Sequence, residues 1–74
     1  MIMPDPYKIL AKLQLVLDNP NPNAEVHKFM VMELCTDAII SMCDYVEKHP
    51  YDSDIIGIIV RKRIGAAQRQ VGVQ

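Results

Sequence analysis

The longest regular hydrophobic pattern in the chain lies between Asn23 and Pro50. Apolar side chains recur there every three or four residues, the spacing that places them on one face of an α-helix. The row expected to face the core consists of Val31, Cys35, Ala38, Met42 and Tyr45, and it is widened by Leu34, Ile39 and Val46. The charged residues that fall on the opposite side are Glu33, Asp37, Asp44 and Lys48. The pattern predicts a long central helix over about residues 24–48.

A shorter amphipathic pattern precedes the central helix. Asp5 can accept hydrogen bonds from free N–H groups at a helix start, and Pro6 suits the first helical position because no N–H is needed there. The apolar residues that share one face are Ile9, Leu10, Leu13, Val16 and Leu17. Leu15 points away from this face. The sequence therefore predicts a first helix over about residues 6–18.

Asparagine and proline alternate from Asn19 to Asn23. Such a segment cannot continue a helix, because proline lacks the N–H donor and holds the preceding residue in an extended conformation. Either Asn21 or Asn23 can cap the helix that follows. A connector this short favours two antiparallel neighbouring helices, which form an αα-hairpin.

The apolar run from Ile55 to Val60 is rich in β-branched residues, which a buried strand also favours. A helix is predicted instead, because Asp52 or Ser53 can cap it, basic residues follow it, and a lone strand would have no partner. Its apolar face consists of Ile56, Ile59, Val60, Ile64, Ala67 and Val71. We expect this third helix over about residues 54–70, so that residues 1–74 form one small helical domain.

A second apolar side lies on the central helix, on the side that also carries Glu33 and Asp37. Its hydrophobic residues are Val26, Phe29, Met30 and Ile40. A chain of 74 residues buries only about 60% of its unfolded surface and is marginally stable alone. We therefore expect an all-α arrangement of a short helix, a long central helix and a C-terminal helix, completed by a homodimer. The alternative is a monomer in which the first and third helices cover opposite sides of the central helix.

The two cysteines, Cys35 and Cys43, lie eight residues apart on the predicted helix. That separation is about 12 Å along the axis, whereas a disulfide needs Cα atoms within about 7 Å. Both are expected to be buried free thiols, as in a reducing cytoplasm. The alternative is an intermolecular disulfide or a reactive thiol. Met1 to Pro4 is too short for a signal peptide, and no apolar run approaches the roughly 18 residues of a membrane span. The sequence thus predicts a cytoplasmic protein that does not bind membranes.

The formal net charge of −1 argues against a general electrostatic attraction to nucleic acid or acidic membranes. A basic patch is nevertheless predicted near the C-terminus, formed by Arg61, Lys62, Arg63 and Arg69. Four cations could contact phosphates in a salt-sensitive manner. They could equally pair with the acidic row Glu33, Asp37 and Asp44, within a monomer or across a dimer, and this interpretation is favoured because both signs are present in one chain.

No catalytic, metal-binding or cofactor-binding pattern is evident, and His27 and His49 have no potential ligand at suitable spacing. The chain is therefore not expected to be an enzyme or to hold a cofactor. The predicted function is a protein-interaction module, of the adaptor, accessory-subunit, chaperone or inhibitor kind, with Val26, Phe29, Met30 and Ile40 at the interface. The alternative is a small nucleic-acid-binding regulator that uses the basic patch.

Overall fold

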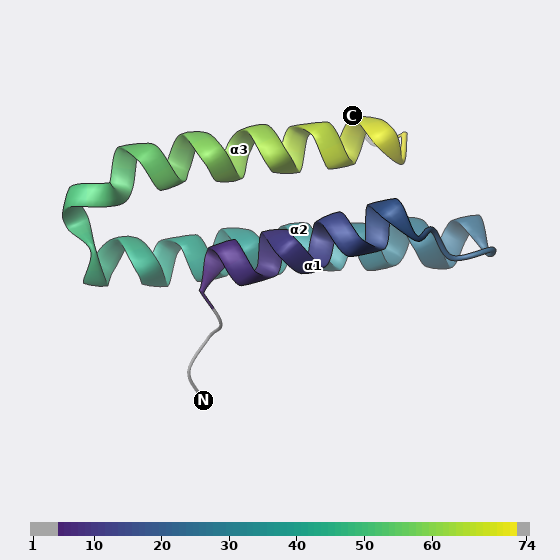
Figure 1. Ribbon diagram of the computed structural model, residues 1–74, viewed down its shortest axis with the longest axis horizontal. Helices are drawn as coiled ribbons and strands as arrows, with labels where there is room; N and C mark the ends of the chain where they lie inside the picture. The colour runs from purple at the N-terminus through teal and green to yellow at the C-terminus, as the bar shows by residue number, and fades with distance from the viewer. Residues whose placement is uncertain (1–4, 73–74) are drawn as a thin grey trace.

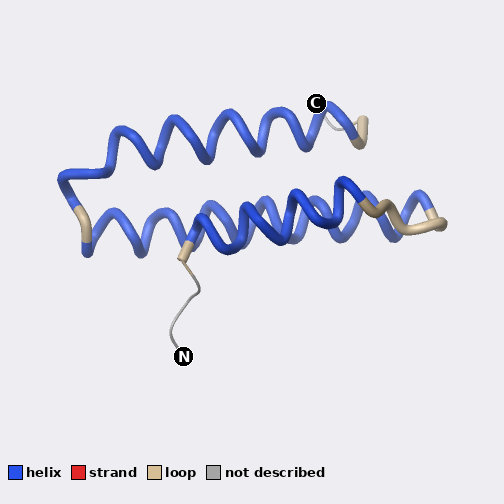
Figure 2. The backbone as a smooth tube through the Cα atoms, viewed as in Figure 1, coloured by secondary structure: helices blue, strands red, loops and turns tan. Residues whose placement is uncertain are grey.

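The computed structural model describes residues 5–72, and in this range it contains helices and no strand. Three α-helices, α1 (Pro6–Asp18), α2 (Ala24–Lys48) and α3 (Ser53–Gln70), are joined by a connector and by the short 3-10 turn η1 (Pro50–Asp52). Figure 1 shows that α1 and α3 each run along α2 in the opposite direction, and Figure 2 shows how little of the described chain is loop. The all-α, three-helix arrangement predicted from the sequence is confirmed. Met1 to Pro4, where no targeting segment was expected, lie outside the described residues.

The first two helices begin with the caps that the sequence indicated. The Asp5 Oδ1 accepts a hydrogen bond of 2.7 Å from the Tyr7 N–H, and Pro6 occupies the first helical position. The Asn23 Oδ1 accepts from the Val26 N–H at 3.1 Å, while Asn21 accepts from the Asn23 N–H at 2.9 Å. Such caps satisfy N–H groups that have no partner inside the helix. The asparagine-rich connector therefore determines where α2 begins.

The start of α3 differs from the prediction that Asp52 or Ser53 would cap it through a side chain. Pro50 opens the 3-10 turn, the Asp52 N–H donates to the His49 carbonyl at 3.1 Å, and no side chain caps the helix. Ser53 is already helical, with φ −58° and ψ −41°. Because the turn continues directly into α3, the helix begins one residue earlier than expected and needs no cap of the usual kind.

The hydrophobic core is formed by one face from each of the three helices. The buried residues are Ile9, Leu10 and Leu13 from α1, Val31, Cys35 and Ala38 from α2, and Ile56, Val60, Ile64 and Ala67 from α3. Each pair of helices is in contact, including α1 with α3. Both outer helices therefore pack against the same broad side of α2, and not on its two opposite sides. The other side of α2 is not covered by any element within residues 5–72.

One contact ties α1 to α3 at the edge of this core. The half-buried Arg63 side chain donates from Nη2 to the Gln14 Oε1 at 3.1 Å and to the Leu10 carbonyl at 3.5 Å. Its position follows from the helical repeat, which places Arg63 between the buried Val60 and Ala67. Arg63 thus links α3 to α1, and it is separated from the other cations of the predicted basic patch.

Candidate interaction surface

The uncovered side of α2 carries a continuous set of apolar side chains. Phe29 is 70% exposed, Ile40 50%, Ile39 46% and Met32 43%. Together with Thr36 and Cys43, which are also exposed, these residues will be called the outer row of α2. Residues 29, 32, 36, 39 and 43 follow one another at spacings of three and four, the repeat by which a helix contacts a second helix. The outer row is therefore built like a helix-packing face, although no element of the described chain covers it.

The four residues predicted for the interface are all exposed, but they do not share one strip. Phe29 and Ile40 belong to the outer row. At about 100° per residue, Val26 and Met30 lie further round α2, toward the edge that α1 covers. Both are less exposed than Phe29, at 44% and 37%. The uncovered surface is thus centred on Phe29 and Ile40, with Val26 and Met30 at its border.

Met32 and Ile39 were not assigned to an exposed surface from the sequence. Ile39 was placed at the edge of the core-facing row, and this was wrong, because α3 reaches only as far as Met42 and leaves Ile39 at the rim. Met32 was left unassigned. The signal that identifies both is the second three-and-four spacing from residue 29 to residue 43, which runs beside the core-facing row.

A groove between α2 and α3 borders the outer row on one side. It encloses about 290 Å³ and is lined by Ile39, Met42, Val60, Arg61, Ile64, Gly65 and Gln68. A Cβ atom added at Gly65 would lie 3.4 Å from Arg69 Nη1, so the Arg69 guanidinium reaches back over Gly65 toward this groove. Arg61 and Arg69 will be called the basic edge. They place positive charge along the α3 side of the outer row.

The opposite border of the outer row is acidic. At about 100° per residue, Glu33 and Asp37 follow Phe29 and Ile40 on the side away from α3. They will be called the acidic edge, and they line a shallow cavity of about 300 Å³ together with Phe29, Met32 and Thr36. The outer row therefore separates a basic edge on α3 from an acidic edge on α2.

The two charged edges form no ion pair with each other in the part of the chain that the structure describes. Among the described residues the ion pair is Lys48 Nζ to Asp44 Oδ2 at 3.2 Å, between side chains that are 60% and 41% exposed. Such a surface pair contributes at most about 1 kcal/mol. The expectation that the α3 cations pair with the acidic row inside a monomer is therefore wrong, because the outer row lies between them. Pairing across a dimer stays a prediction.

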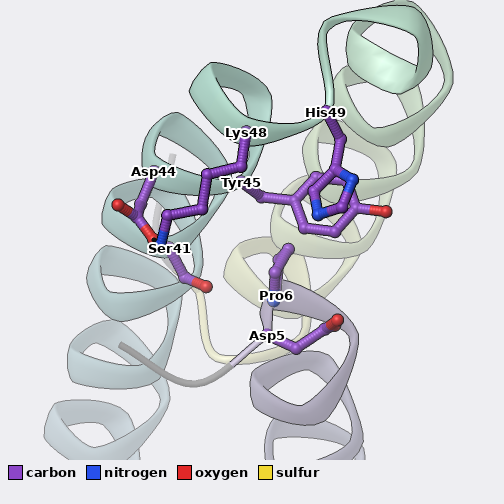
Figure 3. Close-up of a pocket in the computed structure, with 7 residues that line it drawn as sticks. All are labelled: Asp5, Pro6, Ser41, Asp44, Tyr45, Lys48 and His49. Atoms are coloured by element: carbon purple, nitrogen blue, oxygen red, sulfur yellow. Dashed lines mark hydrogen bonds and ion pairs between the residues drawn. The ribbon is translucent and has the colours of Figure 1, made fainter. Parts of the chain in front are cut away.

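A small pocket lies where the start of α1 meets the end of α2. It encloses about 150 Å³ and is lined by Asp5, Pro6, Ser41, Asp44, Tyr45, Lys48 and His49. The His49 and Tyr45 rings lie over each other (Figure 3), and their centroids are 4.3 Å apart. Tyr7 meets Tyr45 edge-on at 6.2 Å. Burial, and then the negative charge of Asp52, raise the pKa of Tyr45. The Tyr45 ring is thus packed between Tyr7 and His49 where α1 and α2 meet.

The two thiols occupy different environments. Cys35 is buried in the core, and burial raises the pKa of its thiol, so it stays protonated at neutral pH. Cys43 is exposed on the outer row. Neither forms a disulfide, as the eight-residue spacing predicted, but the expectation that both would be buried is wrong for Cys43. Its position on the wheel places it beside Ile39 and Ile40 and away from the core.

Residues 5–72 hold neither a metal-binding cluster nor a helix that could span a membrane. Among these residues, no group of three or more histidine, cysteine or acidic side chains is arranged to hold a metal ion. The Nδ1 atom of His27 is buried and has no hydrogen-bond partner among the described residues. None of the described helices has both the length and the apolar character that crossing a membrane requires.

Comparisons with protein-family models, with curated proteins and with solved structures find no match to this chain. No relative therefore indicates a function, and the proposed function rests on the outer row and its two charged edges.

Proposed function

We propose that this chain is a helical protein-interaction module, without catalysis of its own, whose outer row on α2 binds an apolar helix of another protein chain. The observation that carries the proposal is the exposure of Phe29, Met32, Ile39 and Ile40 in one strip. Burying such a side chain against a partner contributes about 1.5–3 kcal/mol. Contiguous apolar patches on soluble proteins commonly mark binding surfaces. The three-and-four spacing indicates that the bound element is a helix.

The composition of the outer row supports binding rather than a packing defect. Phenylalanine and methionine are enriched at interfaces, and methionine adapts its flexible thioether to the partner's shape. The groove beside Ile39 and Met42 extends the surface toward α3. A helix laid on the outer row would cover both the row and the mouth of this groove. Such a module can act as an adaptor, an accessory subunit, a chaperone or an inhibitor.

The proposal can be tested by placing a photo-crosslinking amino acid at position 29 in cells that produce the protein. The matched control places the same residue at Leu15, which is 63% exposed but lies on α1. We expect covalent adducts to a protein from position 29 and none from position 15, detected as mass shifts and identified by mass spectrometry. Adducts from both positions alike, or from neither, would show that the outer row is not a binding face.

A second candidate function, nucleic-acid binding, is favoured by one observation. Arg61, Lys62 and Arg69 are exposed, and none of them forms an ion pair among the described residues. Three phosphate contacts predict a plot of log affinity against log salt with a slope of about −2.7 per chain. Fluorescence anisotropy with a labelled duplex at low salt measures this slope. No binding at low salt, or equal binding by a variant with all three charges reversed, would eliminate this function.

A further inference from the structure

The two charged edges restrict how a second copy could cover the outer row. Glu33 and Asp37 border the row on the side away from α3, and Arg61 and Arg69 border it on the α3 side. Like charges placed opposite each other are unfavourable at an interface, whereas opposite charges select one orientation. The surface is therefore asymmetric across the outer row. This asymmetry distinguishes the possible symmetric dimers.

A two-fold axis that relates two contacting faces lies in the plane between them. If the axis is perpendicular to α2, the two α2 helices are antiparallel, and each acidic edge faces the other copy's acidic edge. If the axis is parallel to α2, the two helices are parallel, and each acidic edge faces the other copy's basic edge. Only the second arrangement brings opposite charges together on both sides of the row.

The charges also match in their level along α2. Because α3 is antiparallel to α2 (Figure 1), its last turn lies beside the start of α2, where Gln70 and Val71 line a common cavity with His27 and Lys28. Its middle lies beside Ile39 and Met42, where Arg61 lines the groove. Arg69 is therefore level with the part of α2 near Glu33. An axis parallel to α2 preserves these levels.

Arg61 is level with the part of α2 that follows Asp37 by about one turn, between Asp37 and Asp44. Both cations of the basic edge therefore have a carboxylate of the other copy at a similar level. Within one chain the same cations and carboxylates form no ion pair among the described residues. A parallel dimer therefore brings together the opposite charges that stay apart within one chain.

We propose that the occupant of the outer row is a second copy of this chain, paired as a parallel two-fold dimer in which Arg69 faces the partner's Glu33 and Arg61 faces the partner's Asp37. This proposal rests on the proposed function and adds the identity and direction of the partner. Equivalent residues of the two rows then meet at the axis. Cys43 lies against the partner's Cys43, within the Cα separation of about 7 Å that a disulfide allows.

The antiparallel alternative gives a different result for the same thiol. With the row centred on Thr36, Cys43 would lie opposite the partner's Phe29. The two Cys43 residues would then be fourteen residues, or about 21 Å, apart along the axis. Disulfide formation at Cys43 therefore reports the direction of the helices, because Cys35 is buried in the core and does not reach the interface.

The experiment combines light scattering after size exclusion with oxidation by oxidised glutathione. Its disulfide accepts the two electrons lost by the two thiols and leaves as two glutathione molecules. We expect the reduced protein to have the mass of a dimer, and near-complete conversion to a covalent dimer on oxidation, with none in Cys43→Ser. The Phe29→Asp variant, which should be monomeric, controls for linkage by random collision.

A charge-reversal pair tests the ionic part of the proposal. Arg61→Glu with Arg69→Glu makes both edges acidic, and Glu33→Arg with Asp37→Arg makes both edges basic, so each double variant should be largely monomeric alone. Mixed in equal amounts, the two should form a heterodimer, which links at Cys43 as the unaltered protein does. Each double variant should have the same helical content as the unaltered chain in circular dichroism.

The possible outcomes separate this inference from the proposed function. A dimer that does not link at Cys43, or charge variants that stay dimeric alone, would overturn the parallel pairing and leave the outer row as a binding face. A monomer at all concentrations whose position 29 crosslinks to a different protein would overturn the second copy as occupant. A monomer without any adduct at position 29 would contradict both proposals.

Discussion

The core-facing row of α2, formed by Val31, Cys35, Ala38, Met42 and Tyr45 and called the inner row from here on, has different surroundings from the outer row. Val31 and Ala38 of the inner row are completely buried, whereas Phe29 and Ile40 of the outer row are at least half exposed. The inner row contributes the small side chains of Val31, Cys35 and Ala38 to the buried core, while its larger residues Met42 and Tyr45 are partly buried against that core. The inner row therefore belongs to the core of the single chain, whereas the outer row is the exposed surface that we propose receives a partner.

Under the proposed function, the inner row of α2 stabilises the fold and the outer row mediates association. The ten buried apolar residues from the three helices form a small core. A small core leaves little reserve of stability. Changes in the inner row should therefore act on folding. Changes in the outer row should act on association and leave the fold of each chain in place.

The largest expected effect comes from Val31→Asp, in the inner row. Val31 has no exposed surface, so the new carboxylate would be buried among apolar side chains without a partner. Such burial costs several kcal/mol, a large part of the stability of a domain of this size. We expect the helical signal in circular dichroism to collapse at room temperature. A variant that melts like the unaltered protein would show that the inner row is not the core.

The second-largest effect is expected from Phe29→Asp, which lies in the outer row two residues before Val31. Its side chain is already in water, so a carboxylate there costs the monomer little. At a dimer interface the same carboxylate would be desolvated opposite its symmetry mate. We expect unchanged helical content and a monomer mass by light scattering.

Leu15→Asp is the matched control for Phe29→Asp, because Leu15 is similarly exposed on α1. It should leave the mass of the assembly unchanged. If Phe29→Asp kept the mass of the unaltered protein, the outer row would not be the association surface. If Leu15→Asp also produced a monomer, the effect would come from added negative charge alone.

Much of this architecture could be predicted from local signals in the sequence. Asp5, Pro6 and Asn23 mark helix starts because their chemistry acts on adjacent backbone groups. The inner row was identified because a strict helical repeat produces one continuous apolar face. These features depend on neighbours within a turn or two of the chain, which is the range that a sequence pattern reports.

The features that could not be predicted depend on how the helices meet. Whether Ile39 is core or rim depends on how far α3 reaches across α2. Ser53 lost its expected role as a cap because Pro50 began a 3-10 turn that runs into α3. The separation of the acidic and basic edges likewise follows from the packing of α1 and α3 on one side of α2. Such relations are set by the tertiary arrangement, and a helical wheel of one element does not contain them.

The smallest expected effect is the pH dependence of stability that comes from Cys35, the buried thiol of the inner row. Burial raises the pKa of this thiol above its ordinary value of 9.0. Below pH 9.0 the thiol is protonated in both the folded and the unfolded chain, so its contribution to stability is fully present. As the pH rises above 9.0, the unfolded chain releases its proton first. The contribution is lost as the pH rises through the folded-state pKa.

Urea unfolding followed by circular dichroism between pH 7 and pH 10 measures this loss. The Phe29→Asp background keeps association from contributing, and the window ends near the ordinary pKa of 10.0 for Tyr45, which is raised in the same direction. We expect Cys35→Ala to remove part of the alkaline decline in the free energy of unfolding. Cys43→Ala, in the outer row, should leave the decline in place. Equal declines in both variants would mean that the Cys35 thiol is no more shielded from water than the Cys43 thiol, which would contradict the distinction between the rows.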